Sequence, residues 1–214
     1  MERKVNLADR YTKVFLVVTF ILGFIGHGFE VSREAMITLT PWVLLIASSV
    51  VCYPAIRKAN NQAIIWLVIA FAGTFVAEVI GVKSGLIFGD YKYGEVLGVK
   101  VFEVPLIIGI NWVLVMLGAI SLGNYFSTNT FLTALIAALI AVIFDIILEP
   151  VAITLGYWKW SNVSPPLSNY NSWFVIVFIL AVIYGKMKVS MNLTIPRFYL
   201  FVQTLFFLLL QAIL

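Results

Sequence analysis

Charged residues are scarce in this chain: of its 214 residues, 11% are Asp, Glu, Lys or Arg, while 62% are hydrophobic. Soluble domains carry about 25% charged residues, so this chain lacks the polar surface that folding in water requires. Its basic residues stand singly or in pairs near the ends of apolar segments, which gives no indication of nucleic-acid binding. The composition therefore predicts an integral membrane protein.

Residues that build several common functional sites are also missing. One cysteine, Cys52, excludes an internal disulfide, and with one histidine, His27, no His/Cys metal site is expected. The sequence has no phosphate-binding Gly loop ending in Lys-Ser/Thr and no Gly-x-Ser-x-Gly elbow. It also has no Asp-rich Mg²⁺ motif of the kind that membrane prenyltransferases need. The last apolar segment has no lysine for a retinal Schiff base, which excludes a rhodopsin.

The apolar residues fall into segments long enough to cross a membrane, for which about 20 residues are needed. The segments cover residues 13–30, 36–56, 62–81, 103–122, 128–155, 172–187 and 196–214. We expect an all-α integral membrane protein with about seven transmembrane helices, folded as a single polytopic membrane domain over residues 1–214. The fifth segment contains Pro150, which removes a helical hydrogen bond, so a kink or a helix end is expected near it.

The positions of the basic residues predict the orientation of the chain, because cytoplasmic loops carry an excess of Lys and Arg. With the N-terminus in the cytoplasm, nine basic residues fall on that side and five on the other. The cytoplasmic group is Arg3, Lys4, Arg10, Lys13, Arg57, Lys58, Lys186, Lys188 and Arg197, and the outer group is Arg33, Lys83, Lys92, Lys100 and Lys159. We expect a multi-pass protein of the cell membrane with its N-terminus in the cytoplasm and its C-terminus outside.

Two polar regions, residues 78–112 and 145–173, resemble each other in spacing. Each opens with a carboxylic residue that precedes an aromatic-Lys-aromatic triplet by thirteen residues: Tyr-Lys-Tyr at 91–93 and Trp-Lys-Trp at 158–160. Proline, and then Asn near Trp, follow each triplet. The spacing suggests a parallel repeat of helices 3-4 and 5-6 about an axis along the membrane normal, although aromatic and Lys residues gather at any membrane interface.

Ionisable residues within membrane spans are costly and commonly functional. The candidates are His27, Glu30, Glu78, Glu103, Asp145 and Glu149, and all lie in the outer half or at the outer boundary of the expected topology. Asp145 and Glu149 are four residues apart and so share one face of a helix. Two carboxylates so close in a low dielectric cannot both ionise cheaply, so the pair offers an acid and a base together.

Structural roles for some of these residues stay open alongside the functional ones. Glu149 could reach water at a helix end before Pro150, and Glu78 could pair with Lys83 at the interface. His27 could be a satisfied hydrogen-bonding group in a glycine-rich helix contact. The aromatic residues of the two triplets are either membrane-interface anchors or π-faces around a cation.

The motifs of the two polar regions resemble those of a known family. They read E-x-x-G-x-x-x-G-x-x-F-G-x-Y-x-Y at 78–93, followed by Val-Pro, and D-x-x-x-(D/E)-P-x-A-x-x-x-G-x-W-x-W at 145–160, followed by Pro and by Asn near Trp. This pattern is similar to the carotenoid biosynthesis membrane family, which includes CruF-type carotenoid 1,2-hydratases and archaeal bisanhydrobacterioruberin hydratases. The resemblance covers about residues 75–175. It departs from the family at 161–173, where the family has a Gly-Tyr-Tyr-Gly-Val-Pro-like run before the Asn.

The resemblance implies a hydratase that adds water to the terminal C=C bond of an acyclic carotenoid. This reaction needs a carboxyl acid that protonates carbon, aromatic faces around the resulting carbocation and a base for the attacking water, but no cofactor and no metal. The catalytic residues would be Asp145 as proton donor, assisted by Glu149 or Glu78. The substrate-binding residues would be Tyr91, Tyr93, Trp158, Trp160, Trp112, Asn111, Asn171, Trp173 and His27.

The expected partners are the acyclic carotenoid, water, membrane lipid and other membrane enzymes of the carotenoid pathway. Three alternatives use the same acidic cluster: a carotenoid cyclase, a lipid or carotenoid carrier, and a proton-coupled transporter. The mass of the product separates the two enzymes, because hydration adds one water whereas cyclisation adds nothing. A carrier would return its ligand unchanged.

Overall fold

The computed structural model describes residues 7–214 and confirms the all-α membrane architecture. Within this part of the chain, seven helices are long and apolar enough to cross a membrane. They are α1 (Leu7–Gly28), α2 (Glu30–Ile56), α3 (Asn61–Ser84), α4 (Leu106–Phe126), α5 (Thr130–Thr154), α6 (Leu167–Lys186) and α7 (Thr194–Gln211). Arg3 and Lys4, which contributed to the predicted orientation, lie outside the described residues.

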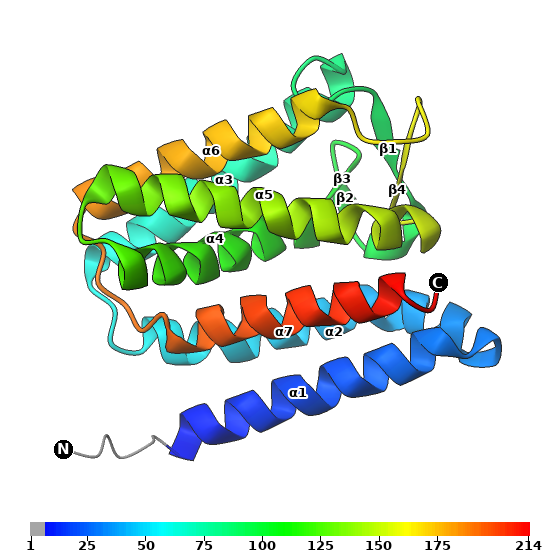
Figure 1. Cartoon of the computed structure of the whole chain (residues 1–214), viewed down its shortest axis with the longest axis horizontal. Helices are drawn as coiled ribbons and strands as arrows, with labels where there is room; N and C mark the ends of the chain where they lie inside the picture. The colour runs from blue at the N-terminus through cyan, green and yellow to red at the C-terminus, as the bar shows by residue number, and fades with distance from the viewer. Residues whose placement is uncertain (1–6) are drawn as a thin grey trace.

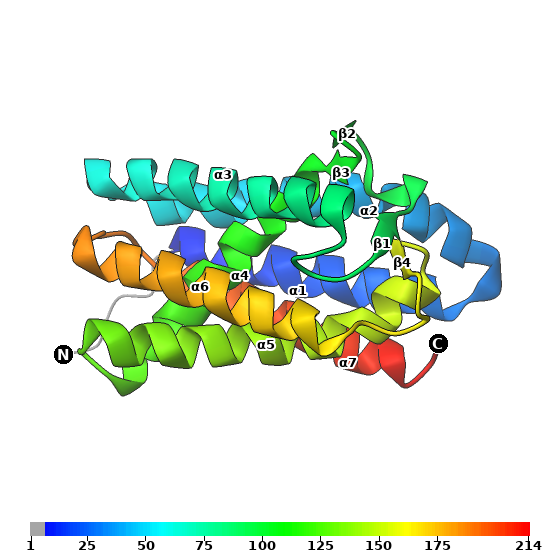
Figure 2. The ribbon, with the colours of Figure 1, turned by 90° about the horizontal axis from the view of Figure 1, so that it is seen from above.

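Successive helices alternate in direction, so the start of α1 and the C-terminus lie at opposite ends of the bundle (Figure 1). Helices α3 and α5 run in one direction and α4 and α6 in the other, as a parallel repeat of α3-α4 and α5-α6 requires. The loops after α3 and after α5 both lie at the end that carries the C-terminus, and the view from above shows them side by side (Figure 2). We call this end of the bundle, formed by residues 85–105 and 155–166, the loop end.

Helix α4 forms the centre of the bundle. It contacts α2, α3, α5 and α7, and its buried residues occupy all of its faces from Val113 to Ser121. A helix that is hydrophobic all round is typical of such a buried position. By contrast, α1 packs against α2 and α7 and forms one side of the bundle, where most of its apolar side chains face outward (Figure 1).

Two short antiparallel strand pairs close the loop end. Strand β1 (Tyr91–Tyr93) pairs with β4 (Trp158–Trp160), so the two predicted triplets lie directly against each other. Strand β2 (Lys100–Val101) pairs with β3 (Val104–Pro105) just before α4, and a short 3₁₀ helix, η1 (Glu95–Leu97), lies between β1 and β2. The first pair joins the loop after α3 to the loop after α5.

The helix boundaries differ from the expected ones at several helix ends, among them those next to Glu30 and Glu103. Helix α5 continues through Pro150 and ends at Thr154, near this proline and within one residue of the expected segment end. Glu30, expected within the first span, begins α2, since the chain breaks at Phe29. Glu103, expected to open the fourth span, lies exposed in the turn between β2 and β3 with a φ of 70°.

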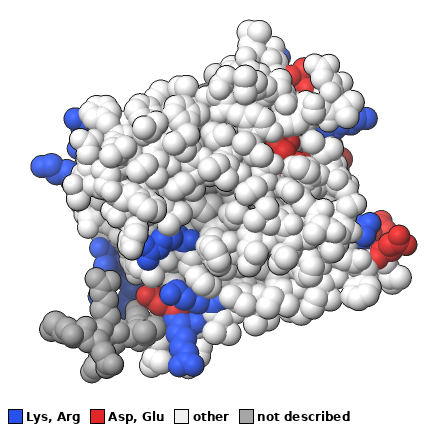
Figure 3. All heavy atoms as spheres, viewed as in Figure 1, with Lys and Arg blue, Asp and Glu red and all other residues white. Residues whose placement is uncertain are grey.

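The distribution of charge over the surface agrees with a membrane-spanning bundle. On the face seen in Figure 3, Lys, Arg, Asp and Glu side chains gather toward the two ends of the helices, and the broad middle is uncharged. Large apolar side chains such as Val68 and Phe201 are more than 60% exposed on this bundle. Lipid tails can cover such side chains at no cost in polar contacts.

Candidate active site

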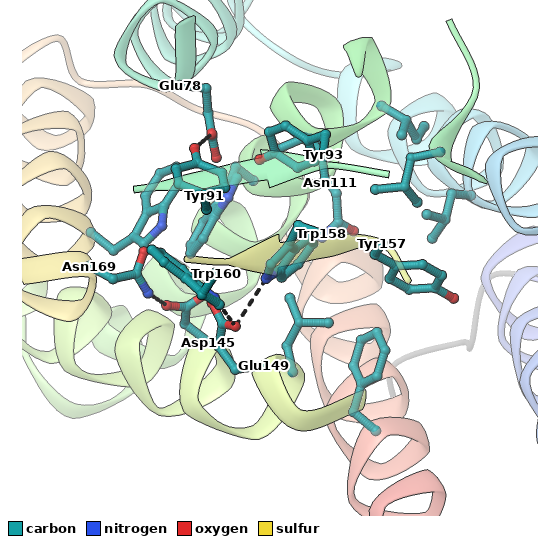
Figure 4. A pocket seen from close by; sticks show the side chains of 18 of the residues that line it. Glu78, Tyr91, Tyr93, Asn111, Asp145, Glu149, Tyr157, Trp158, Trp160 and Asn169 are labelled. Atoms are coloured by element: carbon teal, nitrogen blue, oxygen red, sulfur yellow. Dashed lines mark hydrogen bonds between the residues drawn. The ribbon is translucent and has the colours of Figure 1, made fainter. Parts of the chain in front are cut away.

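Three carboxyl groups from two helices meet in one cavity at the loop end. Glu78 comes from α3, and Asp145 and Glu149 come from α5; none of the three residues is more than 3% exposed. They line a cavity of about 50 Å³, shown in Figure 4. No Lys or Arg of the described residues lines it. Buried carboxyls without a basic partner are costly and mark a functional site in a membrane protein.

Glu149 is held by two tryptophans of the strand that follows its own helix. The indole Nε1 atoms of Trp158 and Trp160 each donate a hydrogen bond to Glu149 Oε2, both at 3.0 Å. The two indoles can reach one oxygen because β4 turns back over the end of α5, and residues two apart in a strand point to the same side. The first turn after α5 uses Gly156 with a φ of +71°, a conformation that glycine adopts without strain.

Asp145 is held by a residue that the sequence did not single out. The Asn169 Nδ2 atom donates a 2.7 Å hydrogen bond to Asp145 Oδ2, and Asn169 is 3% exposed at the start of α6. Asn171, which the family pattern indicated, lies on the exposed side of that helix. The helical period gives the signal that was overlooked, because Asn169 and Trp173 are four residues apart and share a face whereas Asn171 does not.

Glu78 is held by a phenol from the first loop. The Tyr91 hydroxyl donates a hydrogen bond to Glu78 Oε2. Lys83, the alternative partner of Glu78, instead places its Nζ 4.8 Å from the centre of the Phe102 ring. Burial raises the pKa of both Tyr91 and Tyr93 well above the ordinary value. These phenols therefore stay protonated at neutral pH and remain hydrogen-bond donors.

The register of β1 and β4 places the aromatic residues of both triplets on the cavity side. Tyr91 lies opposite Trp160, Tyr93 opposite Trp158, and the two lysines opposite each other. Side chains alternate between the two faces of a strand, so the lysines are exposed while all four aromatic residues line the cavity. The ring centres of Tyr91 and Trp160 are 4.8 Å apart.

A second aromatic group, from α4, α6 and the loop after α3, also contributes to the cavity wall. The Trp112 ring of α4 stacks on the Trp173 ring of α6 with centres 3.6 Å apart, and Phe88 stacks on Trp173 at 4.9 Å. The Phe88 ring occupies the space beside Gly81, where any larger residue of α3 would collide with it. Two groups of aromatic rings therefore belong to the cavity that contains the three carboxyl groups.

Helix α7 also contributes to the cavity, which the sequence did not reveal. Asn111 Oδ1 of α4 accepts hydrogen bonds from Gln203 Nε2 at 2.9 Å and from the Tyr199 hydroxyl at 3.2 Å. Because its oxygen is occupied in this way, Asn111 can offer its amide nitrogen to the cavity. Tyr199 and Gln203 are one helical turn apart on α7, a spacing that a search of the last span for polar pairs would have found.

Most of the predicted site residues line this one cavity. They are Glu78, Tyr91, Tyr93, Asn111, Trp112, Asp145, Glu149, Trp158, Trp160 and Trp173. Two predicted residues do not: Asn171 faces outward on α6, and His27 lies in a separate cavity between α1, α2 and α7. Together the lining groups provide carboxyl groups for proton transfer, π-faces for a cation and an amide for a polar ligand.

Comparison with known proteins assigns the chain to a family. The sequence model of the family described as "Carotenoid biosynthesis protein" matches residues 39–214, which include every carboxyl and aromatic residue of the cavity. The chain belongs to the carotenoid biosynthesis protein family.

Among curated proteins, one relative of this chain is a bisanhydrobacterioruberin hydratase from Haloarcula japonica (strain ATCC 49778 / DSM 6131 / JCM 7785 / NBRC 101032 / NCIMB 13157 / TR-1). It is 26% identical over 137 residues, and the match covers 58% of this chain and 44% of the relative. The aligned part thus spans less than half the length of that protein. No solved structure matches this carotenoid biosynthesis protein.

Proposed function

We propose that this protein is a carotenoid hydratase that adds water to the terminal C=C bond of an acyclic carotenoid. The observation that carries the proposal is the convergence of three buried carboxyl groups inside an aromatic wall. The family and the hydratase name of a relative support the substrate class and the reaction.

In the proposed reaction, the Asp145 carboxyl transfers its proton to the less substituted carbon of the terminal double bond. The π electrons form the new C–H bond, and the neighbouring carbon becomes a tertiary carbocation. Water then forms a C–O bond to that carbon, and its proton passes to the Glu149 carboxylate. One water is consumed, and the proton returns from Glu149 to Asp145, one helical turn away, before the next cycle.

The hydrogen bonds of the site favour this division of roles. Glu149 Oε2 accepts from two indoles, and two fixed donors suit a group that begins the cycle as a carboxylate. Asp145 accepts from one neutral carboxamide through Oδ2. We assign the transferable proton to the other carboxyl oxygen of Asp145. Glu78, which accepts from Tyr91, is assigned a supporting role on the opposite side of the cavity.

The walls of the cavity suit the carbocation and the water. Tyr91, Tyr93, Trp158 and Trp160 present ring faces, and a cation over a desolvated aromatic ring is stabilised by about 2 kcal/mol or more. A cavity of about 50 Å³ has room for a few water molecules. Water bound beside the carboxyl groups would capture the carbocation, whereas a cyclase must keep water away while the chain end folds back on itself.

The test is expression in a host that makes an acyclic carotenoid, followed by mass analysis of the extracted pigments. We expect a product heavier than the substrate by one water, or by two if both ends react. A product of unchanged mass but altered absorption would show cyclisation and contradict the hydratase. Unchanged pigment that co-purifies with the protein would indicate a carrier, and pH-dependent uptake into vesicles would indicate a transporter.

We also propose the orientation that the basic residues predict, with the loop end and the C-terminus outside the cell membrane. The active cavity would then open near the outer leaflet. A reporter fused after Leu214 and active only outside the cytoplasm would test it. Activity of a cytoplasm-specific reporter at the same position would contradict this orientation.

A further inference from the structure

A second cavity, of about 460 Å³, lies between α1, α2 and α7. It is several times larger than the carboxyl cavity described above and is walled mainly by apolar side chains, among them Phe20, Met36 and Phe206. Leu22 and Leu39 also line it and are 60% and 46% exposed. The cavity therefore reaches the apolar outer surface of the bundle, which faces lipid in a membrane.

The two cavities adjoin each other. Leu44, Tyr157, Gln203 and Phe207 line both of them. In Figure 4, Tyr157 lies beyond Trp158 as seen from Asp145 and points away from the carboxyl groups. Gln203 donates to Asn111 in the carboxyl cavity. A molecule held between α1, α2 and α7 would thus be separated from the carboxyl groups only by these shared side chains.

This larger cavity contains two buried acceptors with no hydrogen-bond donor among the described residues. His27 and Gln203 are 4% and 1% exposed, and His27 Nε2 and Gln203 Oε1 have no partner there. His27 Nδ1 lies 2.7 Å from the Gly23 carbonyl oxygen, which can only accept, so Nδ1 carries the proton of the neutral ring. Nε2 is then an acceptor, as is the Gln203 oxygen. Buried acceptors are nearly always paired, so both atoms point to a missing donor.

We propose that this cavity binds the isoprenoid chain of the substrate next to its reacting end, and that His27 accepts a hydrogen bond from a hydroxyl group on that chain. The single O–H of a hydroxyl can donate to one of these acceptors, and we assign it to His27 Nε2. The apolar walls suit the remaining hydrocarbon. The exposed side chains on α1 and α2 provide a lateral route from the lipid. This inference rests on the proposed function for the identity of the chain, but in the Asp145→Asn variant binding can be measured without turnover.

The test uses the full-length protein in lipid nanodiscs, titrated with an acyclic carotenoid and with its monohydroxylated counterpart. Binding is followed by quenching of tryptophan fluorescence by the polyene. We expect the hydroxylated chain to bind about threefold to tenfold more tightly, the effect of one neutral hydrogen bond. His27→Leu should abolish this preference, His27→Gln should restore part of it, and Leu22→Trp at the exposed mouth should weaken binding of both chains.

Equal affinity of the wild-type protein for the two carotenoids would overturn the proposal, as would an intact preference in His27→Leu. A phospholipid that stays bound, by mass spectrometry, at saturating carotenoid would also overturn it. Asp145→Asn separates this inference from the proposed function, because it should stop hydration and leave the binding preference intact. Preferential binding without hydration by the wild type would reject the hydratase alone, whereas hydration without preference would reject the hydroxyl subsite alone.

Discussion

The two polar regions, residues 78–112 and 145–173, have the same spacing but supply different chemistry. Each begins with a buried carboxyl on a helix and continues into a strand thirteen residues later, and the strands pair symmetrically about Lys92 and Lys159. In the first region, the strand donates to the carboxyl at the start of the motif, through Tyr91 to Glu78. In the second, Trp158 donates instead to Glu149, one turn after Asp145.

This shift by one helical turn leaves Asp145 free of its own strand. Asn169 of α6 binds it instead, so the second region contains two carboxyl groups with separate partners where the first contains one. A similar scaffold therefore yields an acid-base pair on one side of the cavity and a single supporting acid on the other. The predictions below test whether the two regions differ in function as they differ in hydrogen bonding.

The largest effect is expected for Asp145→Asn. This change removes the proposed proton donor while keeping the size of the side chain and the contact with Asn169. We expect hydration to fall about 10³-fold, within the range of general-acid catalysis, when membranes containing the variant are supplied with the acyclic carotenoid. Asp90→Asn, a matched change of an exposed loop carboxyl, should stay near wild type. Full activity of the Asp145→Asn variant would show that Asp145 is not the proton donor.

Parallel Glu→Gln variants compare the two regions directly. Glu149→Gln removes the proposed base but keeps an oxygen for the indoles, and we expect a fall of about 10²-fold in rate. Glu78→Gln should cost about tenfold at most, because Glu78 is assigned a supporting role. Initial rates measured in the same membranes rank the two variants. If Glu78→Gln lowered the rate more than Glu149→Gln, the first region would supply the more important carboxyl group.

Asn169 and Asn171 offer a matched pair on one helix. Asn169→Ala removes the donor to Asp145 Oδ2, and we expect about a tenfold loss of activity, the effect of one hydrogen bond to an ionisable group. Asn171→Ala changes a side chain exposed to the surroundings and should stay within about twofold of wild type. Equal losses in both variants would show that the effect comes from α6 as a whole.

The smallest effect on rate is expected for Tyr91→Phe in the first region. The change leaves Glu78 buried without its donor, which should lower the free energy of unfolding by about 1–3 kcal/mol. Activity should fall only a few-fold. Thermal unfolding in detergent measures the change, with Tyr53→Phe as control because Tyr53 is 65% exposed. A Tyr91→Phe protein as stable as the control would show that the Tyr91–Glu78 contact contributes no stability.

The sequence was sufficient to predict the helices and the carboxyl cluster but not the partners of each carboxyl. The spans follow from hydropathy, and the cluster follows from the cost of ionisable groups in lipid, which leaves Glu78, Asp145 and Glu149 few other roles. Helical spacing indicates that Asn169 and Gln203 share a face with other polar or aromatic residues, but it does not indicate which groups they contact. These contacts depend on how α6 and α7 are rotated about their axes, and side-chain packing between helices determines that rotation.

The pairing of β1 with β4 also determines when the site can form during biosynthesis. Tyr91 and Trp160 lie opposite each other in the sheet, yet α4 and α5 separate them in the chain. Chains are synthesised from the N-terminus, so an early segment cannot form its contacts with a later segment until that segment has been made. Until the ribosome has completed β4, the first triplet has no strand to pair with, and Glu149 lacks its indole donors. A protein truncated before residue 158 would therefore contain all three carboxyl groups in its helices but no assembled cavity.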